Sequence, residues 1–556
     1  MNRTSPRRIF GVLAVAVLLV GCGRNEAPKA AALPSAAADK TVIAPQRLKE
    51  HLAVLSADAM EGRGPGTPGA AKARDYIIAT LKTLGVGPGP EGWIQKVPLR
   101  RITNTERKLS VRGQGVDRAF EVGDHFVTEN ARGAGDWKGS GEIVYCGHGV
   151  QAPEYGWDDF KGLDCKGKVL LVFVGDPVTE DRSLFAGDAM TYYGRWTYKL
   201  EKARELGALG CLIIHRPDWA GYGWLVCQTS WNGNRMDVRQ ADYSKEMLAA
   251  GWISYGAAEV LVKHTGKSLD ELAASAAKKD FKPIPLGIDA ELSIKTASED
   301  VDDENIVGVL PGLDPAQKDD WVIYTAHFDH LGKNEEVKGA DKIFNGAIDN
   351  GSGCAGLLGI AEAFANARAS LKRSVMFLFV CSEEQGLLGS RWYSEHPLVS
   401  PARTVANINI DGLNVLEPTV DLQVVGSGQN DLEGRLAAIV GRDGRTVAPD
   451  SEPEKGYYYR SDHFNFARIG IPALYVKAGD TVAGKPSGYM TAWKETYRQV
   501  HYHQPSDQYD AGWPLTGGAA DALALYRVGF ELAVSDARPA WSKTSEFRAV
   551  REASLK

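Results

Sequence analysis

Histidines and acidic residues stand at the ends of several apolar segments in the second half of this chain. The run 321–326 stops at a histidine, the run 374–381 is followed closely by a Glu-Glu pair, and the run 405–410 stops at an aspartate. Because the carboxyl ends of neighbouring strands in an open α/β sheet surround one crevice, such residues can meet there. Converging imidazoles and carboxylates lose hydration energy unless a cation holds them, which predicts a metal site. The candidate residues are His327, Asp349, Glu383, Glu384, Asp411 and His503.

The segments that must position these residues are typical of an α/β fold. Residues 374–381 are apolar on both faces, as in a central strand of a mainly parallel sheet covered by helices. Residues 351–367 are rich in glycine and alanine and predict a helix that packs closely on that sheet. Two amphipathic helices are expected between residues 45 and 86, on either side of the glycine-dense loop 61–69. The predicted fold class is α/β, with a doubly wound, mainly parallel sheet.

The order and spacing of the candidate residues resemble a known enzyme family. The matching motifs are His327-x-Asp329, Asp349-Asn-Gly-Ser-Gly353, Glu383-Glu384, Asp411 and Tyr502-His503-x-Pro-x-Asp507. They are similar to those of the co-catalytic zinc aminopeptidases, family twenty-eight of the metallopeptidases, which includes secreted bacterial leucyl aminopeptidases. Glutaminyl cyclase and glutamate carboxypeptidase are relatives. The resemblance covers about residues 45–135 and 295–535 and implies the zinc exopeptidase fold.

The resemblance implies two Zn²⁺ ions, with Co²⁺ or Mn²⁺ as substitutes. Two such ions about 3.5–4 Å apart need a shared ligand, and a carboxylate with two oxygens can bridge them. Asp349 suits that role because backbone can approach closely in its glycine-rich turn. By resemblance, His327 and Asp411 are the further ligands of one ion, and Glu384 and His503 are the further ligands of the other. His503 is preferred to the neighbouring His501 because the proline and aspartate that follow it match the family's closing motif.

Two further acidic residues are expected to act beside the metal. Asp329 lies two residues beyond His327, a spacing that returns it to the same face of a strand, where it would accept the second imidazole N–H. By resemblance, Glu383 is the proton shuttle. It takes a proton from the water that bridges the ions, the resulting hydroxide attacks the scissile carbonyl, and Glu383 passes the proton to the leaving amine.

Residues 460–473 also resemble a family segment. Asp462 and His463 are expected either to line the site, where they could stabilise the oxyanion, or to support it structurally. The preceding tyrosines, with Tyr458 at their centre, are candidates for a substrate-pocket wall or for core packing.

At 556 residues, the chain is too long for one core. Within 139–290, the Lys-Gly-Lys-Val-Leu-Leu-Val stretch and the helix–strand pattern 201–215 resemble the protease-associated domain, a small β-rich module inserted in many exported peptidases. We expect 46–138 to be the N-terminal part of the peptidase domain, 139–290 the inserted domain, 295–535 the catalytic part and 536–556 a C-terminal tail. The acidic run 298–305 predicts a solvated linker.

The N-terminus predicts export. Residues 1–22 combine a positive segment, an apolar run too short to span a bilayer and a Leu-Val-Gly-Cys box that resembles the bacterial lipoprotein signal. Cys22 would carry the lipid, and 23–45, rich in alanine and proline, would be a disordered tether. Export could use the general or the twin-arginine route. We expect anchoring to the bacterial outer membrane, with the enzyme facing the periplasm or the cell surface.

Composition and cysteine positions bear on the possible binding partners and on disulfide bonds. The net charge of -6 favours neither nucleic-acid binding nor attraction to a membrane surface, so the lipid would be the only membrane contact. Four cysteines lie in the middle region, where one disulfide is expected in an oxidising compartment. Two others stand in apolar runs typical of buried small hydrophobic residues. The six are Cys146, Cys165, Cys211, Cys227, Cys354 and Cys381.

These observations predict an exported di-zinc exopeptidase, most simply an aminopeptidase acting on peptides or proteins with a free N-terminus. Alternatives are a single-zinc glutaminyl cyclase, a glutamate-type carboxypeptidase and a receptor-like relative without metals. The presence of His327 and Asp411 argues against the cyclase. The retention of the whole ligand set argues against the receptor.

Overall fold

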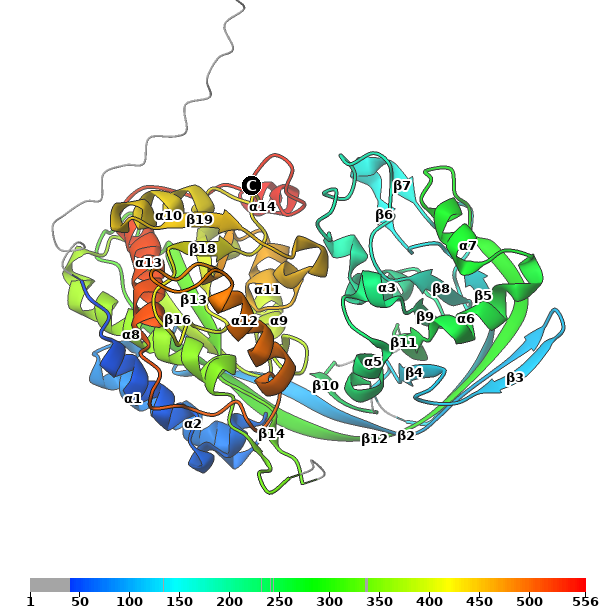
Figure 1. The fold of residues 1–556 in the computed structure, drawn as a ribbon, viewed down its shortest axis with the longest axis horizontal. Helices are drawn as coiled ribbons and strands as arrows, with labels where there is room; N and C mark the ends of the chain where they lie inside the picture. The colour runs from blue at the N-terminus through cyan, green and yellow to red at the C-terminus, as the bar shows by residue number, and fades with distance from the viewer. Residues whose placement is uncertain (1–40, 134, 232, 241, 244, 336–338) are drawn as a thin grey trace, which may run out of the picture. The chain divides into compact units, whose positions relative to one another are not determined.

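A computed structural model describes residues 41–556 apart from 134, 232, 241, 244 and 336–338 (Figure 1). The expected signal segment 1–22, its Cys22 and most of the expected tether lie outside the described residues. Within the described part, no helix is both long and apolar enough to cross a bilayer.

The catalytic region is built on a mixed, mostly parallel sheet. Its strands run in the order β19-β18-β20-β17-β13-β16-β12. Strand β13 pairs in parallel with β16 and β17, and β17 with β20, whereas β12 joins antiparallel. Every residue of β16 is buried, as expected of a central strand. The predicted α/β class is confirmed. The bounds are β12 (Ile284–Leu310), β13 (Trp321–His327), β16 (Ser374–Val380), β17 (Thr404–Asn409), β18 (Asp421–Val424), β19 (Thr446–Pro449) and β20 (Ala473–Ala478).

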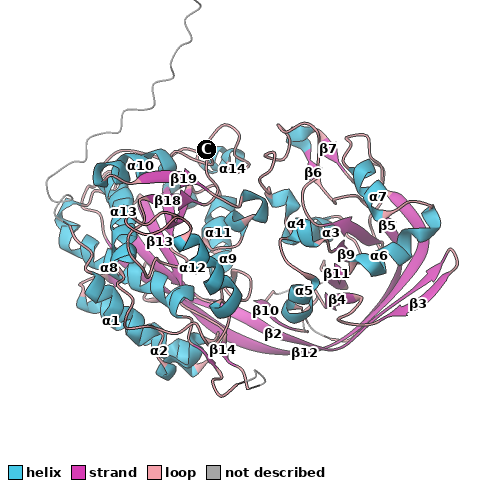
Figure 2. Cartoon of the chain, viewed as in Figure 1, coloured by secondary structure: helices cyan, strands magenta, loops and turns pink. Residues whose placement is uncertain are grey.

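Helices cover both faces of this sheet. On one face α8 (Gly353–Ala367) packs against α1 (Pro45–Leu55) and α13 (Thr516–Val534), and both α8 and α13 contact β13 (Figure 2). On the other face Tyr393 and Phe466 pack on β16 residues. They belong to α9 (Leu388–Glu395) and α11 (His463–Arg468). Further helices of this region are α2 (Pro68–Thr83), α10 (Leu432–Val440), α12 (Tyr489–Thr496) and α14 (Arg548–Ser554).

The acidic run 298–305 is part of strand β12 and not a linker, which corrects the prediction. Strand β12 pairs along its length with β2 (Ile94–Gly113). The Asp300 carboxylate lies 2.8 Å from the Arg100 guanidinium, and Glu299 lies 2.8 Å from Arg101. Opposite charges on adjacent strands stabilise the pairing, and the acidic composition alone does not reveal them.

The inserted region has its own sheet, in the order β5-β8-β9-β11-β4, which joins the catalytic sheet through β12. Its core begins on β2, earlier than the predicted boundary at 139, since Leu109, Val111, Phe120 and Phe126 pack with it. Its main elements are β3 (Val116–Phe120), β4 (Phe126–Glu129), β5 (Trp137–Tyr145), β8 (Val169–Phe173), α3 (Trp196–Glu205), β9 (Gly210–Ile214), α5 (Trp224–Ser230), β10 (Asn234–Val238), β11 (Ala249–Ile253), α6 (Tyr255–Val262) and α7 (Leu269–Ala276).

The structure also corrects the expected disulfide. All six described cysteines are buried and free, so the disulfide expected in the middle region is not formed among them. They serve as small apolar residues, four of them in one cluster of the inserted region. In the expected C-terminal tail 536–556, the Arg551 guanidinium donates hydrogen bonds to the carbonyls of Pro401 and Thr404.

The contact between α13 and β13 gives a test of this packing. In Gly529→Ala, the new Cβ would overlap the hydroxyl oxygen of Tyr324, which is fully buried and donates to the Leu525 carbonyl. We expect a loss of about 1–3 kcal/mol in the free energy of unfolding, measured by chemical denaturation. The control Gly434→Ala, on exposed α10 with open space around it, should be neutral or stabilising. Equal stability of the two variants would contradict the packing.

Candidate metal centre

Three strand ends bring most of the candidate residues together. Strand β13 ends at His327, β16 is followed by Glu383 and Glu384, and β17 by Asp411. Because β13 lies between β16 and β17 and runs parallel to both, these ends form one edge of the sheet. Asp349 comes from the short helical segment Ala347–Ser352 that precedes α8.

Asp349 stands between two imidazoles. Its Oδ1 lies 3.3 Å from the Nε2 of His327, and its Oδ2 lies 3.2 Å from the Nε2 of His503. The Nε2 of His327 is also 3.4 Å from an Asp411 oxygen, and that of His503 is 3.0 Å from a Glu384 oxygen. The two oxygens of one carboxylate therefore face two separate ligand groups, as a bridging ligand would.

The donor set fits a zinc site. The Nε2 atoms of His327, His330 and His503 are buried and make no hydrogen bond within the described part of the chain. Ligand atoms of His327, Asp349 and Asp411 lie within 4.8 Å of one another, as do those of His330, Asp349 and Glu384. Imidazole nitrogens and carboxylate oxygens without thiolate suit Zn²⁺.

The pKa values of the adjacent residues Glu383 and Glu384 are shifted in opposite directions. Burial raises the pKa of Glu383 well above its usual range; His327 opposes this shift, and the charges of Glu384 and Asp411 add to it. Burial also pushes up the pKa of Glu384, but His503 and His330 outweigh it and lower the pKa to about 2. Glu384 therefore stays anionic, as a metal ligand must, while Glu383 can hold a proton.

The structure corrects the contact expected of Asp329. Its carboxylate accepts hydrogen bonds from the backbone N–H groups of Glu383 and Glu384, at 3.0 and 3.3 Å. The Nδ1 of His327 lies 3.3 Å from the carbonyl oxygen of Asp329 and 3.8 Å from its carboxylate. The backbone carbonyl thus takes the place expected of the side chain, and the carboxylate orients the glutamate pair.

Sequence reasoning did not single out His330. Its Nδ1 lies 2.6 Å from an oxygen of Glu384, and its ring is fully buried. His330 follows the same strand as His327, so its place at the strand end was the available signal. It either orients Glu384 or competes with it as a ligand.

Two other residues fix the turn that carries Asp349. The Asp507 carboxylate accepts hydrogen bonds from the backbone N–H groups of Ile348 and Asp349, at 3.0 and 3.1 Å. The buried Arg63 guanidinium donates to the carbonyls of Phe328, Asn345 and Gly346 and so ties this turn to the end of β13. In the sequence, Asp507 is the last residue of the motif Tyr502-His503-x-Pro-x-Asp507. For Arg63, the only sequence signal was its position in the glycine-dense loop 61–69.

Asp462 and His463 lie behind the centre. The Ser390 hydroxyl donates to Asp462 at 2.6 Å. The His463 ring lies 4.9 Å from the ring of Tyr475, whose hydroxyl donates to the Asp411 carbonyl. Both residues are fully buried, which favours the supporting role over the lining role.

Tyr458 and His501 lie outside the candidate metal centre. Tyr458 is buried against His463 and lines a cavity other than the one at Glu383. The ring of His501 faces Ser506 and not the cluster that contains His503.

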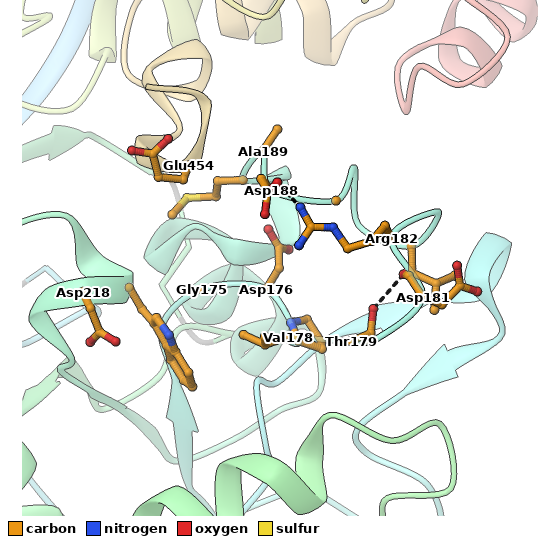
Figure 3. A pocket seen from close by; sticks show the side chains of 15 residues that line it. Gly175, Asp176, Val178, Thr179, Asp181, Arg182, Asp188, Ala189, Asp218 and Glu454 are labelled. Carbon is orange, nitrogen blue, oxygen red and sulfur yellow. Dashed lines mark hydrogen bonds and ion pairs between the residues drawn. The ribbon is translucent and has the colours of Figure 1, made fainter. Parts of the chain in front are cut away.

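The cluster opens on a cavity of about 520 Å³. Glu383, Glu384 and Tyr502 line it on the catalytic side, and residues of α3 and β10 line it from the inserted region. A smaller cavity of about 190 Å³ is lined mainly by residues of the inserted region around Asp176 and Arg182, together with Glu454 of the catalytic region (Figure 3). None of the candidate metal ligands lines the smaller cavity.

Comparisons with known proteins give one family-model match over part of the chain and several structural likenesses. Residues 305–526 match the model of peptidase family M28. An aminopeptidase from Aneurinibacillus sp. strain AM-1 is 20% identical, with a TM-score of 0.47 over 88% of this chain and 93% of that chain. The zinc aminopeptidase BSAP from Bacillus subtilis is 17% identical, with a TM-score of 0.42 over 91% and 97%. A Bacteroides thetaiotaomicron glutaminyl cyclase is 16% identical, with a TM-score of 0.28 over 42% and 78%. The comparison with curated proteins gives no match.

The support of the Asp349 turn can be tested with Asp507→Asn. The amide keeps the shape of the side chain but removes the charge that accepts two backbone N–H groups, so we expect zinc affinity to fall about 10–100-fold, measured by competition with a chelator. Asp510→Asn is the control and should bind zinc normally, since Asp510 is exposed and its carboxylate accepts a hydrogen bond from the Gly512 N–H. Normal zinc affinity of Asp507→Asn would contradict the role of Asp507.

Proposed function

We propose that this protein is a zinc-dependent aminopeptidase with two metal ions, since residues 305–526 match the model of peptidase family M28. The observation that carries the proposal is the position of Asp349, with one oxygen toward His327 and the other toward His503. Asp411 would complete the ligands of the first ion and Glu384 those of the second. The presence of ligands on both sides of Asp349 favours this function over a single-zinc cyclase.

The side chains around the centre have distinct tasks in peptide hydrolysis. Bound zinc would lower the pKa of water and polarise the scissile carbonyl. Glu383 faces the same cavity and lies 3.9 Å from the Nε2 of His327, so it can accept a proton and return it to the leaving amine. Asp329 fixes the backbone of Glu383 and thereby the direction of its carboxylate.

Two carboxylates beside the metal centre support the choice of an N-terminal substrate. Glu383 and Glu384 both line the cavity, and carboxylates suit a free α-ammonium group. We further propose that the enzyme is exported and lipid-anchored through Cys22, and that the inserted region is a protease-associated domain. Export and anchoring rest on the sequence of residues 1–22.

The activity is tested with a panel of aminoacyl peptides and their N-blocked counterparts, using metal-depleted and zinc-restored protein. We expect hydrolysis of the free peptides only after zinc is restored and none of the blocked ones, because the free amine sets the register of cleavage. Cleavage of blocked peptides at a similar rate would refute the aminopeptidase assignment. Full activity of metal-depleted protein would refute the metal.

The proton-transfer role is tested with Glu383→Gln. The amide cannot take a proton, so kcat should fall about 10²–10⁴-fold while zinc content, measured by elemental analysis, stays the same. Glu201→Gln is the matched control, since Glu201 lines the same cavity and pairs with Arg468 at 3.3 Å. Its kcat should change only slightly. An active Glu383→Gln enzyme would show that another group moves the proton.

A further inference from the structure

Two arginines in the wall of the catalytic cavity form no salt bridge with any acidic residue that the structure describes. Arg195 stands immediately before helix α3 of the inserted region, and Arg460 follows Tyr459 in the catalytic region. Both line the cavity that contains Glu383 and Glu384. Arg195 is only 8% exposed, so its charge is held almost entirely out of water.

Three guanidinium nitrogens of these arginines have no hydrogen-bond partner among the described residues. The Nε of Arg195 and the Nε and Nη2 of Arg460 are buried and make no hydrogen bond within the described part of the chain. Aromatic rings are their neighbours, with Tyr457 5.3 Å from the Arg460 guanidinium. Burial, and then the like charge of Arg460, lower the pKa of Arg195 to about 10.

The other arginines of this cavity are all paired, which sets these two apart. Among the described residues, each has a carboxylate within salt-bridge distance. The pairs are Arg204–Glu246 at 3.0 Å, Arg235–Asp237 at 2.9 Å, Arg391–Asp237 at 3.0 Å and Arg468–Glu201 at 3.3 Å.

A buried charge without a partner is costly, and two like charges near each other add repulsion. An anion in the cavity would remove both penalties. The planar guanidinium group matches a carboxylate particularly well, because two parallel N–H groups can donate to its two oxygens. The unpartnered nitrogens of Arg195 and Arg460 in one cavity wall are therefore suited to a carboxylate group.

We propose that Arg195 and Arg460 select peptide substrates that carry a carboxylate close to the scissile bond. The inference rests on the proposed peptidase function, since the arginines share one cavity with Glu383. The carboxylate can be the C-terminus of a short peptide or an acidic side chain, and both present the same group. The inserted region thus contributes to specificity through Arg195.

The experiment compares kcat/KM for matched substrates that differ in one charge. With the best N-terminal residue X from the panel, X-Ala is compared with X-Ala-amide, and X-Glu-amide with X-Gln-amide. We expect the zinc-loaded wild type to prefer the charged member of at least one pair by about tenfold or more. The first pair reports a terminal carboxylate and the second an acidic side chain.

Arg195→Met and Arg460→Met should each bring this charged-to-neutral ratio close to one, mainly through KM, and Arg195→Lys should recover part of it. The ratio is measured within each variant, so partial misfolding does not affect it. Arg468→Met is the control, because it removes a paired arginine from the same cavity, and its ratio should stay near that of the wild type.

The outcomes separate the two proposals. Peptide cleavage with a ratio near one in the wild type, or a ratio unaffected by both methionine variants, would overturn the carboxylate site and leave the peptidase function standing. Failure of the zinc-loaded wild type to cleave any peptide of the panel would overturn the peptidase function and, with it, this inference.

Discussion

The arrangement depends on one carboxylate placed between two imidazoles. Asp349 can serve both His327 and His503 only if its turn is held rigidly, and much of the surrounding structure does this. Asp507 holds the backbone of the turn, and Arg63 ties it to the strand that ends at His327. Without a cation, several acids would repel one another in a buried space, so the polypeptide alone does not offset this cost.

The sheet brings residues that are far apart in the sequence together at one site. Three adjacent strands end at the same edge, and each is followed by a residue of the centre. The long strands β2 and β12 continue from this sheet into the inserted region, so a second core is built on the same strands. That region supplies one wall of the catalytic cavity and, with Arg195, one of the two arginines there that form no salt bridge among the described residues. It therefore takes part in forming the site.

The predictable parts of the structure follow from local signals. Strand β16 and helix α8 were expected from apolar and small-residue patterns, and both were found. The prediction of a solvated linker at 298–305 was wrong, because the arginine partners of these acidic residues lie on a strand about 200 residues away in sequence. For the same reason, the sequence did not predict the roles of Arg63, His330 and the Arg195–Arg460 pair. Their roles come from tertiary neighbours, which a single sequence does not show.

The central claim is that Asp349 is shared between two metal ions. Anomalous diffraction at the zinc edge from crystals of the active enzyme tests it most directly. The account predicts two zinc peaks, one at each oxygen of Asp349, with His327 and Asp411 beside the first and His503 and Glu384 beside the second. A single peak away from Asp349, or no peak in crystals of active enzyme, would contradict it.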